Sequence, residues 1–106
     1  MPKYLIEANY TAEGLKGLRQ QKATSRRTVI SKMIKELGGK VEAFYWSFGE
    51  RDAVALMDLP DANTAAALAL TISSSGLVHT KTTLLMTAEE VDEAFKKSVP
   101  YRPPGN

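Results

Sequence analysis

The stretch at residues 37–61, LGGKVEAFYWSFGERDAVALMDLPD, carries the signals that decide the fold. Its Gly38-Gly39 pair is typical of a helix end, because glycine readily adopts the left-handed conformation common there. Lys40–Phe48 is rich in aromatic residues and predicts a strand. The quartet GERD at 49–52 predicts a turn, and Ala53–Leu59 predicts a second, buried strand. The stretch therefore predicts a β-hairpin that directly follows a helix.

The segment before this hairpin predicts one strand and two helices. Lys3–Tyr10 alternates in character, as expected of a strand with one strongly apolar face. Thr11 is a good N-cap for a short helix that turns Leu15 and Leu18 inward. A second cap signal at Thr24-Ser25 opens a longer helix with one apolar stripe. That stripe consists of Val29, Ile30, Met33, Ile34 and Leu37.

The segment after the hairpin predicts a helix, a strand and a last helix. Asp61 caps an alanine-rich helix that runs from Ala62 to about Ser74. Leu77–Met86 is rich in threonine and predicts a strand. Thr87–Glu90 has the pattern of a capping box, which starts a helix through Lys97. The proline-rich tail at 98–106 is expected to be extended.

The order of these elements defines the fold class. A β-α-β-β-α-β order plus a C-terminal helix predicts an α+β, ferredoxin-like domain over residues 1–106, with a four-stranded antiparallel sheet in the order 4-1-3-2. This order brings the end of strand 1 (Asn9, Tyr10) and the start of strand 4 (Leu77, His79) to one edge. The turn at 49–52 belongs to the same edge.

Composition excludes several kinds of chemistry. The chain has no cysteine, so it has no disulfide, thiolate nucleophile or cysteine metal site. Its start lacks the charged and then apolar regions of a secretory signal. The longest uncharged stretch, 62–79, is too rich in Ala, Ser and Thr to favour a membrane span. We therefore expect a cytoplasmic protein with no membrane partner.

Positive charge is concentrated in the first two predicted helices. Residues 16–40 hold eight basic side chains and one acidic side chain, although the net charge is only +2. This asymmetry permits an anionic or nucleic-acid partner, but solvated helix faces are the simpler interpretation. RNA-binding domains of this topology carry aromatic residues on the central strands, and Ala53–Leu59 has none. We expect no sequence-specific nucleic-acid binding.

The sheet face away from the helices predicts self-association. It would carry Leu5, Glu7, Asn9, His79 and Lys81, with part of the aromatic run at 44–46. A face that mixes large apolar and polar groups in this way is not expected to stay in water. Face-to-face packing of two copies would cover it. We therefore predict a homodimer that packs through this face, or a higher homo-oligomer.

Four segments together resemble the GYD-domain family nearly end to end: MPKYLIEANYTAEGLKGL, LGGKVEAFYWSFGERDAVALMDLPD, TAAALALTISSSGLVHTKTTLLMTAEEVDEA and YRPPG. The resemblance implies a dimeric α/β barrel of ferredoxin-like topology and brings no established activity. The Gly-Tyr-Asp signature of the family corresponds to Gly49, Arg51 and Asp52, so this chain departs from it at the tyrosine. Related families include small monooxygenases, haem-binding proteins and ligand-binding regulatory domains.

Several side chains near the shared edge are candidates for function. His79 is the only histidine and could act as a general base with Asn9 and Asp52, although a lone imidazole is more often structural. Arg51 could close over a carboxylate-bearing ligand. The other candidates for ligand contact are Tyr10, Trp46, Glu7 and Lys81, of which the last two could instead pair across neighbouring strands.

Some of these residues also have a purely structural explanation. Gly49 can supply a positive φ in the turn, and Asp52 can accept hydrogen bonds from backbone amides. One of Tyr45 and Trp46 faces the helices and the other faces the open side, because neighbouring strand residues alternate. One histidine and scattered carboxylates have no zinc-ligand spacing. We expect no metal and no cofactor, with haem left open.

The function predicted first is a homo-oligomeric protein that holds a small organic ligand in a cavity at the sheet edge or dimer interface. The alternative is a cofactor-independent enzyme, monooxygenase- or isomerase-like, that uses His79. A protein with a structural or interaction role and no ligand is the third interpretation.

Overall fold

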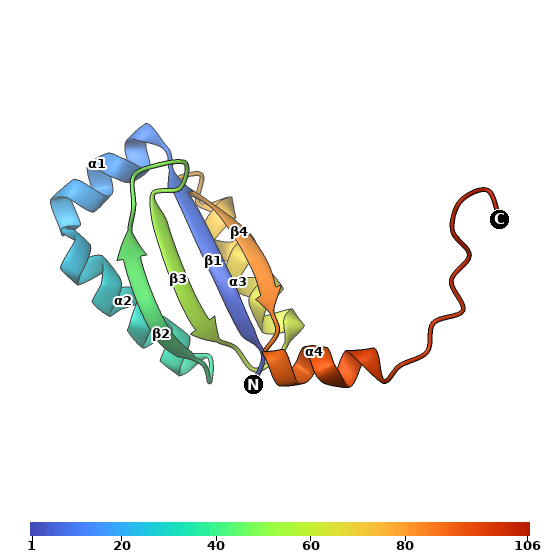
Figure 1. Cartoon of the computed structure of the whole chain (residues 1–106). Helices are drawn as coiled ribbons and strands as arrows, with labels where there is room; N and C mark the ends of the chain where they lie inside the picture. The colour runs from blue at the N-terminus through green and yellow to red at the C-terminus, as the bar shows by residue number, and fades with distance from the viewer.

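The computed structural model describes residues 1–106. It contains four strands and four helices, and Figure 1 shows α1, α2 and α3 on one side of the sheet. The elements are β1 (Lys3–Tyr10), α1 (Ala12–Gln21), α2 (Ala23–Glu36), β2 (Lys40–Trp46), β3 (Ala53–Asp58), α3 (Ala62–Ser74), β4 (Val78–Leu85) and α4 (Ala88–Phe95).

The sheet has the predicted topology. Its strand order is β2-β3-β1-β4, which is 4-1-3-2 read from the other edge, and every neighbouring pair is antiparallel. The prediction of an α+β, ferredoxin-like fold is therefore confirmed. Asn9 lies opposite His79 and Trp46 lies opposite Ala53 in the register. The strand ends and starts thus meet at one edge, as the predicted order requires.

The core lies between the sheet and the helices on its covered face. Alternate residues of β1 and β3 are buried, because successive strand side chains point to opposite faces. Ile34 of α2 and Leu59 after β3 are fully buried. The core cluster consists of Tyr4, Ile6, Ile30, Ile34, Ala55, Met57, Leu59, Ala65 and Leu68.

The start of the second helix differs from the prediction. The helix begins at Ala23 rather than after a cap at Thr24-Ser25, and Lys22 before it makes no side-chain cap. Lys22 has a φ of 76° and donates its N–H to the Leu18 carbonyl at 2.7 Å. The chain therefore ends α1 and starts α2 at the same residue, which leaves no room for a separate cap.

The inward faces of these two helices are narrower than the sequence predicts. Leu15 was expected to point inward, but it is 41% exposed. Helix α1 instead packs through Leu18 and Gly14, where an added Cβ would lie 2.1 Å from the Leu77 carbonyl oxygen. In α2, Val29 and Leu37 of the predicted stripe are exposed as well. Helices α1 and α2 therefore each bury only a narrow stripe of side chains against the rest of the domain.

The C-terminal arm, residues 86–106, extends away from the body (Figure 1). Helix α4 begins at the predicted capping box, in which Thr87 and Glu90 exchange side-chain to backbone hydrogen bonds. No residue of α4 is buried, and Phe95 is 80% exposed. The helix ends at Phe95, two residues before the predicted end. None of the helices combines the length and the apolar character needed to cross a membrane.

Candidate functional site

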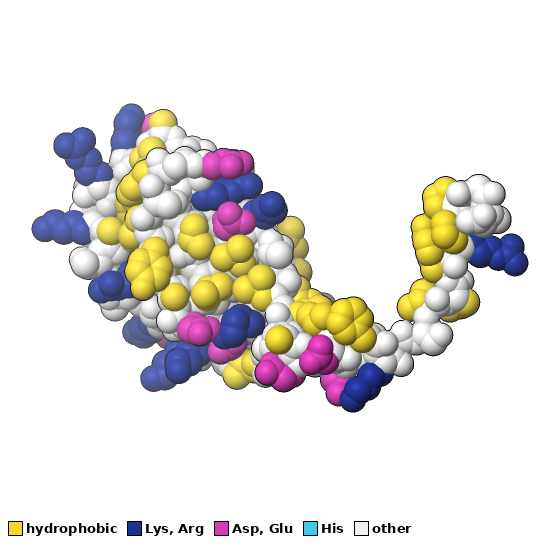
Figure 2. Space-filling model, viewed as in Figure 1, with side chains coloured by type: hydrophobic (Ala, Val, Ile, Leu, Met, Phe, Trp, Pro, Cys, Tyr) yellow, Lys and Arg dark blue, Asp and Glu magenta, His cyan; other side chains and the backbone are white.

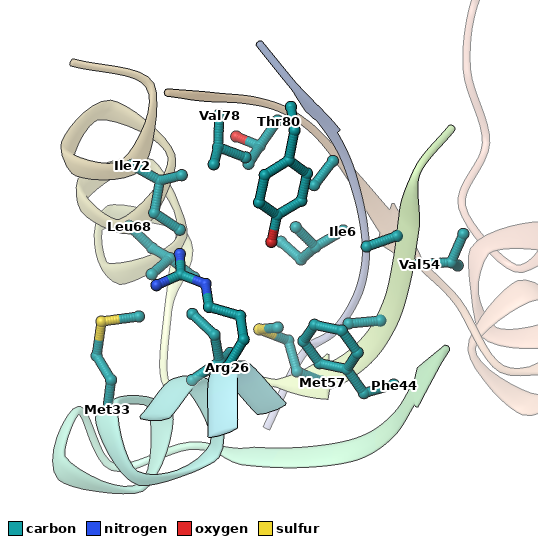
Figure 3. Close-up of a pocket in the computed structure, with 15 residues that line it drawn as sticks. Ile6, Arg26, Met33, Phe44, Val54, Met57, Leu68, Ile72, Val78 and Thr80 are labelled. Atoms are coloured by element: carbon teal, nitrogen blue, oxygen red, sulfur yellow. The ribbon is translucent and has the colours of Figure 1, made fainter. Parts of the chain in front are cut away.

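A cavity of about 50 Å³ lies between the sheet and helices α2 and α3 (Figure 3). Thirteen of its fifteen lining residues are hydrophobic. Ile6 and Phe44 form the sheet side, while Ile30, Leu68 and Ile72 form the helix side. Ile6, Ile30 and Leu68 belong to the core cluster, and Phe44 and Ile72 pack against it. The cavity is therefore an apolar chamber on the covered face of the sheet.

Three polar groups line this apolar chamber: the two non-hydrophobic side chains, Arg26 and Thr80, and the hydroxyl of Tyr10, which is one of the thirteen hydrophobic residues. Arg26 is the fourth residue of α2, and Figure 3 shows its side chain extending into the space beside Leu68 and Ile72. The Arg26 guanidinium makes no hydrogen bond and no ion pair with the protein. The Thr80 hydroxyl oxygen is buried and likewise lacks a protein partner. The third group is Tyr10, at the end of β1.

An outer hollow of about 240 Å³ adjoins the chamber. The two spaces share Tyr10, Arg26 and Val78, so the guanidinium stands where they meet. The outer hollow is bounded by α1, which contributes Gly17, and by the turn from α3 to β4, which contributes Leu77. No acidic side chain lines either space. The hollow therefore forms a mouth of mixed polar and apolar character beside the apolar chamber.

An aromatic row lies beside the chamber. Trp46 packs against Tyr10 and Phe44, with ring centroids 5.7 and 5.4 Å apart, and stacks on Phe48 at 6.0 Å. Trp46 thus lies on the helix-covered face of β2, whereas Tyr45 is 72% exposed on the open face. Tyr10 and Phe44 belong to the chamber wall, so this row holds one side of the chamber in place.

Asp52 and Asn9 form a clip between β1 and the start of β3. The Asp52 carboxylate accepts a hydrogen bond from the Tyr10 backbone N–H at 2.8 Å. The Asp52 N–H donates in turn to the Asn9 side-chain oxygen at 3.1 Å and to the Ala8 carbonyl at 3.0 Å. This clip fixes the backbone at Tyr10, which stands at the chamber mouth. Asp52 therefore positions a wall of the pocket.

The backbone conformation of the turn between β2 and β3 differs from the prediction. Phe48 takes the positive φ, at 51°, whereas Gly49 does not have one. The turn closes through Ser47, whose N–H donates to the Asp52 carbonyl at 3.0 Å and whose hydroxyl donates to the Arg51 carbonyl. The prediction that Gly49 supplies the positive φ of the turn is wrong, because Phe48, one residue earlier, adopts it instead.

Arg51 and Glu7 form an ion pair on the open face of the sheet. The Arg51 Nε lies 3.6 Å from the Glu7 carboxylate, and both side chains are about a quarter exposed, at 31% and 22%. Lys81 lies opposite Glu7 in the register but forms no ion pair with it. The predicted pairing of Glu7 with Lys81 is therefore wrong, since the turn delivers Arg51 to this carboxylate instead.

His79 lies apart from the chamber. It is exposed on β4, opposite Asn9 in the register, and is not among the residues that line the chamber or its mouth. The Asn9 side-chain oxygen already accepts the Asp52 N–H. The structure therefore brings Asn9, Asp52 and Tyr10 together, while His79, Glu7, Arg51 and Lys81 belong to the open face. No cluster of three or more His, Cys, Asp or Glu side chains is present.

Residue-level reasoning from the sequence missed Arg26 and Thr80. Arg26 precedes Ile30 and Ile34 by one and two helical turns, so the i, i+4 spacing places it on the inward stripe of α2. Thr80 alternates with Val78 on β4 and shares its covered face. The i, i+4 spacing of Arg26 and the alternation of Thr80 can both be recognised in the sequence. These patterns do not show, however, that an apolar chamber lies beside the two side chains.

Shifted pKa values occur away from the chamber. Glu42 and Asp58 hydrogen-bond to the Lys3 ammonium and raise the pKa of Lys3, at the opposite end of β1 from Tyr10. The Thr64 backbone N–H lowers the pKa of Asp61, and the Thr87 backbone N–H lowers the pKa of Glu90. The two carboxylates act as helix caps. These shifts therefore report structural interactions at the ends of strands and helices.

The fold and the pocket define an α+β, ferredoxin-like domain with an internal apolar chamber on the covered face of its sheet. The model of the GYD domain matches residues 4–95, and the chain belongs to the GYD-domain family. The resemblance in the sequence is thereby confirmed. Comparison with curated proteins and with solved structures finds no match.

Proposed function

We propose that this chain is a homodimeric small-molecule-binding protein whose ligand occupies the chamber of each protomer. The observation that carries the proposal is the apolar chamber with an unpaired guanidinium at its mouth. Ligand sites are typically apolar clefts with a few polar groups that fix orientation. The site differs in place from the cavity expected at the dimer interface, although its mouth lies at the predicted sheet edge.

The homodimer is supported by the open face of the sheet. Figure 2 shows hydrophobic side chains gathered in the middle of this face, with charged side chains at its margins. Leu5 and Leu56 lie opposite each other there, and Tyr45 lies opposite Val54. An exposed apolar area with a polar rim is the usual pattern of a protein interface. A second copy of the same face would cover it symmetrically.

A ligand screen on paired variants tests the binding site. We would measure thermal shifts of the full chain with a panel of neutral, cationic and anionic small molecules, since a ligand that binds the native state stabilises it. Ala8 lines the chamber and is half-buried, so Ala8→Leu places a larger side chain inside. Ala67 is exposed on α3, which makes Ala67→Leu the matched control.

We expect some compounds to raise the melting temperature of the wild type and of Ala67→Leu, and to lose this effect in Ala8→Leu. Shifts that persist in a folded Ala8→Leu variant would place the ligand elsewhere. A panel that produces no shift with the wild type would contradict the proposed function.

A further inference from the structure

Resting on the proposed function, we infer that the ligand is a monocarboxylate with a short apolar chain. Its carboxylate pairs with the Arg26 guanidinium, and its chain fills the chamber behind. The inference follows from three properties of the pocket: the kind of polar group it offers, the balance of charge, and its size.

The polar groups of the chamber favour an acceptor. Arg26 can only donate hydrogen bonds, and the hydroxyls of Thr80 and Tyr10 can each donate one. The buried Thr80 hydroxyl has no partner in the chain, as is also true of Thr82 outside the chamber, so it is free to donate to a ligand group. A carboxylate has two oxygens and only accepts when ionised. It therefore matches this set better than an alcohol or an amine does.

The charge of the site is uncompensated. Arg26 is half-buried, faces thirteen hydrophobic lining residues and has no acidic neighbour in the chamber or its mouth. A cation that is partly shielded from water and has no partner gains from an anion that pairs with it. Helix α2 begins at Ala23, three residues before Arg26, and has no acidic residue in its first turn, so its positive end adds to the same charge. One anionic group would balance the guanidinium.

The shape of a guanidinium selects among anions. Its planar fork binds a carboxylate through two parallel hydrogen bonds. The surrounding walls are apolar, so the rest of the ligand must be apolar too. The structure therefore favours an amphipathic acid over a multiply charged anion, which a single arginine would leave partly unpaired.

The volume of the chamber limits the length of the ligand's apolar chain. Its volume of about 50 Å³ corresponds to several water-sized positions, because one water needs roughly 10–15 Å³ on this measure. Roughly three to five such positions accommodate a chain of about three to five carbons behind the carboxylate. The wider mouth, of about 240 Å³, gives solvent and ligand access to the guanidinium. Longer acids would have to project into this mouth.

Calorimetric titration of the full chain with hexanoate, hexan-1-ol and hexylammonium tests the inference. Arg26→Gln removes the charge, while Arg27→Gln removes a neighbouring charge that is exposed and lines neither space. We expect hexanoate to bind best to the wild type. Arg26→Gln should weaken hexanoate binding by about tenfold to a hundredfold, as expected for a charged hydrogen bond, and Arg27→Gln should leave it unchanged.

Thr80→Val keeps the side-chain shape, removes the partnerless hydroxyl and provides a second variant if Arg26→Gln fails to fold. It should weaken hexanoate binding without lowering the stability of the free protein. Equal binding of hexanoate to wild type and to both variants would overturn the inference. Preferential binding of hexanol or hexylammonium, lost in Ala8→Leu, would overturn it while leaving the proposed function intact. Binding of no compound from any class would overturn both.

Discussion

At the scale of single residues, Asp52 acts through the backbone. Asp52 accepts the Tyr10 N–H, and its own N–H is held by Asn9 and Ala8. These bonds lock the end of β1 against the start of β3, where the pocket wall begins. Arg51, the preceding residue, pairs with Glu7 on the open face of the sheet. These two neighbouring residues of the turn thus both contact β1, Asp52 at the Tyr10 backbone and Arg51 at the Glu7 side chain.

Removal of the Asp52 carboxylate should therefore destabilise the fold. We expect Asp52→Ala to lower the free energy of unfolding by about 1.5–3 kcal/mol, the usual range for a hydrogen bond to a charged group. Urea unfolding measures this change. Glu50, in the same turn, is exposed, so Glu50→Ala should change stability by less than about 0.5 kcal/mol. Equal effects of the two substitutions would contradict the clip.

The sequence predicted Asn9, Tyr10 and Asp52 as neighbours because strand order alone brings their positions together. It did not predict their bonds, because side-chain direction at a strand end depends on the local turn. The positive φ at Phe48 rather than Gly49 is the relevant example. Arg26 was counted among the basic residues of solvated helices, although its spacing from Ile30 marked it as inward.

At the scale of elements, caps and alternation account for the success of the prediction. Thr11, Asp61 and Thr87 each cap a helix with the side chain, as predicted. The junction of α1 and α2 was not predicted, because nothing in the local sequence marks Lys22 as a left-handed residue. Sequence patterns predict least well those ends of helices and strands that depend on tertiary packing.

The two glycines of α1 should respond oppositely to substitution. A Cβ at Gly14 would lie 2.1 Å from the Leu77 carbonyl oxygen, whereas a Cβ at Gly17 would meet nothing within 4 Å. Gly17→Ala should stabilise the fold by about 0.5–1 kcal/mol through helix propensity. Gly14→Ala should destabilise it, because the helix must move away from the Leu77 backbone in the turn before β4. Thermal unfolding of both variants without ligand measures the contrast, and equal shifts would contradict this packing.

Helix α4 should lose structure in acid. Thr87 lowers the pKa of Glu90 below its ordinary value of 4.5, so the carboxylate is the form that the folded helix prefers. Its stabilising contribution is present above that value and is lost as pH falls below it. We expect NMR signals of residues 88–95 to report fraying over this range.

Glu90→Gln should flatten that pH dependence, because a glutamine can still accept the Thr87 N–H but does not titrate there. Glu89 lies in the same turn without the capping bond, so Glu89→Gln should keep the dependence. Identical pH profiles in the two variants would show that the capping box does not control α4.

At the scale of the whole molecule, the two faces of the sheet have separate roles in the proposed function. The covered face holds the ligand chamber, and the open face joins two copies. The sequence predicted the open face because alternation assigns Leu5 and Glu7 to it. It could not predict the chamber, because a cavity arises where side chains from β1, β3, α2 and α3 fail to fill the space between them.

The dimer should dissociate when a charge enters the open face. Leu56 lies in the centre of that face, so Leu56→Glu should yield monomers at micromolar concentration, while the wild type has twice the mass of one chain. Leu70 is exposed on α3, and Leu70→Glu should leave the dimer intact. Light scattering measures the mass. A monomeric wild type, or a dimeric Leu56→Glu variant, would contradict the face-to-face arrangement.

The central claim is that the ligand enters the chamber on the covered face, and methyl NMR during a hexanoate titration tests it most directly. We predict that the methyl signals of Ile30, Leu68 and Ile72, which line the chamber, shift with added hexanoate. Those of Leu5 and Leu56 on the open face should not shift. Shifts confined to Leu5 and Leu56, or no shift at any methyl group, would contradict the account.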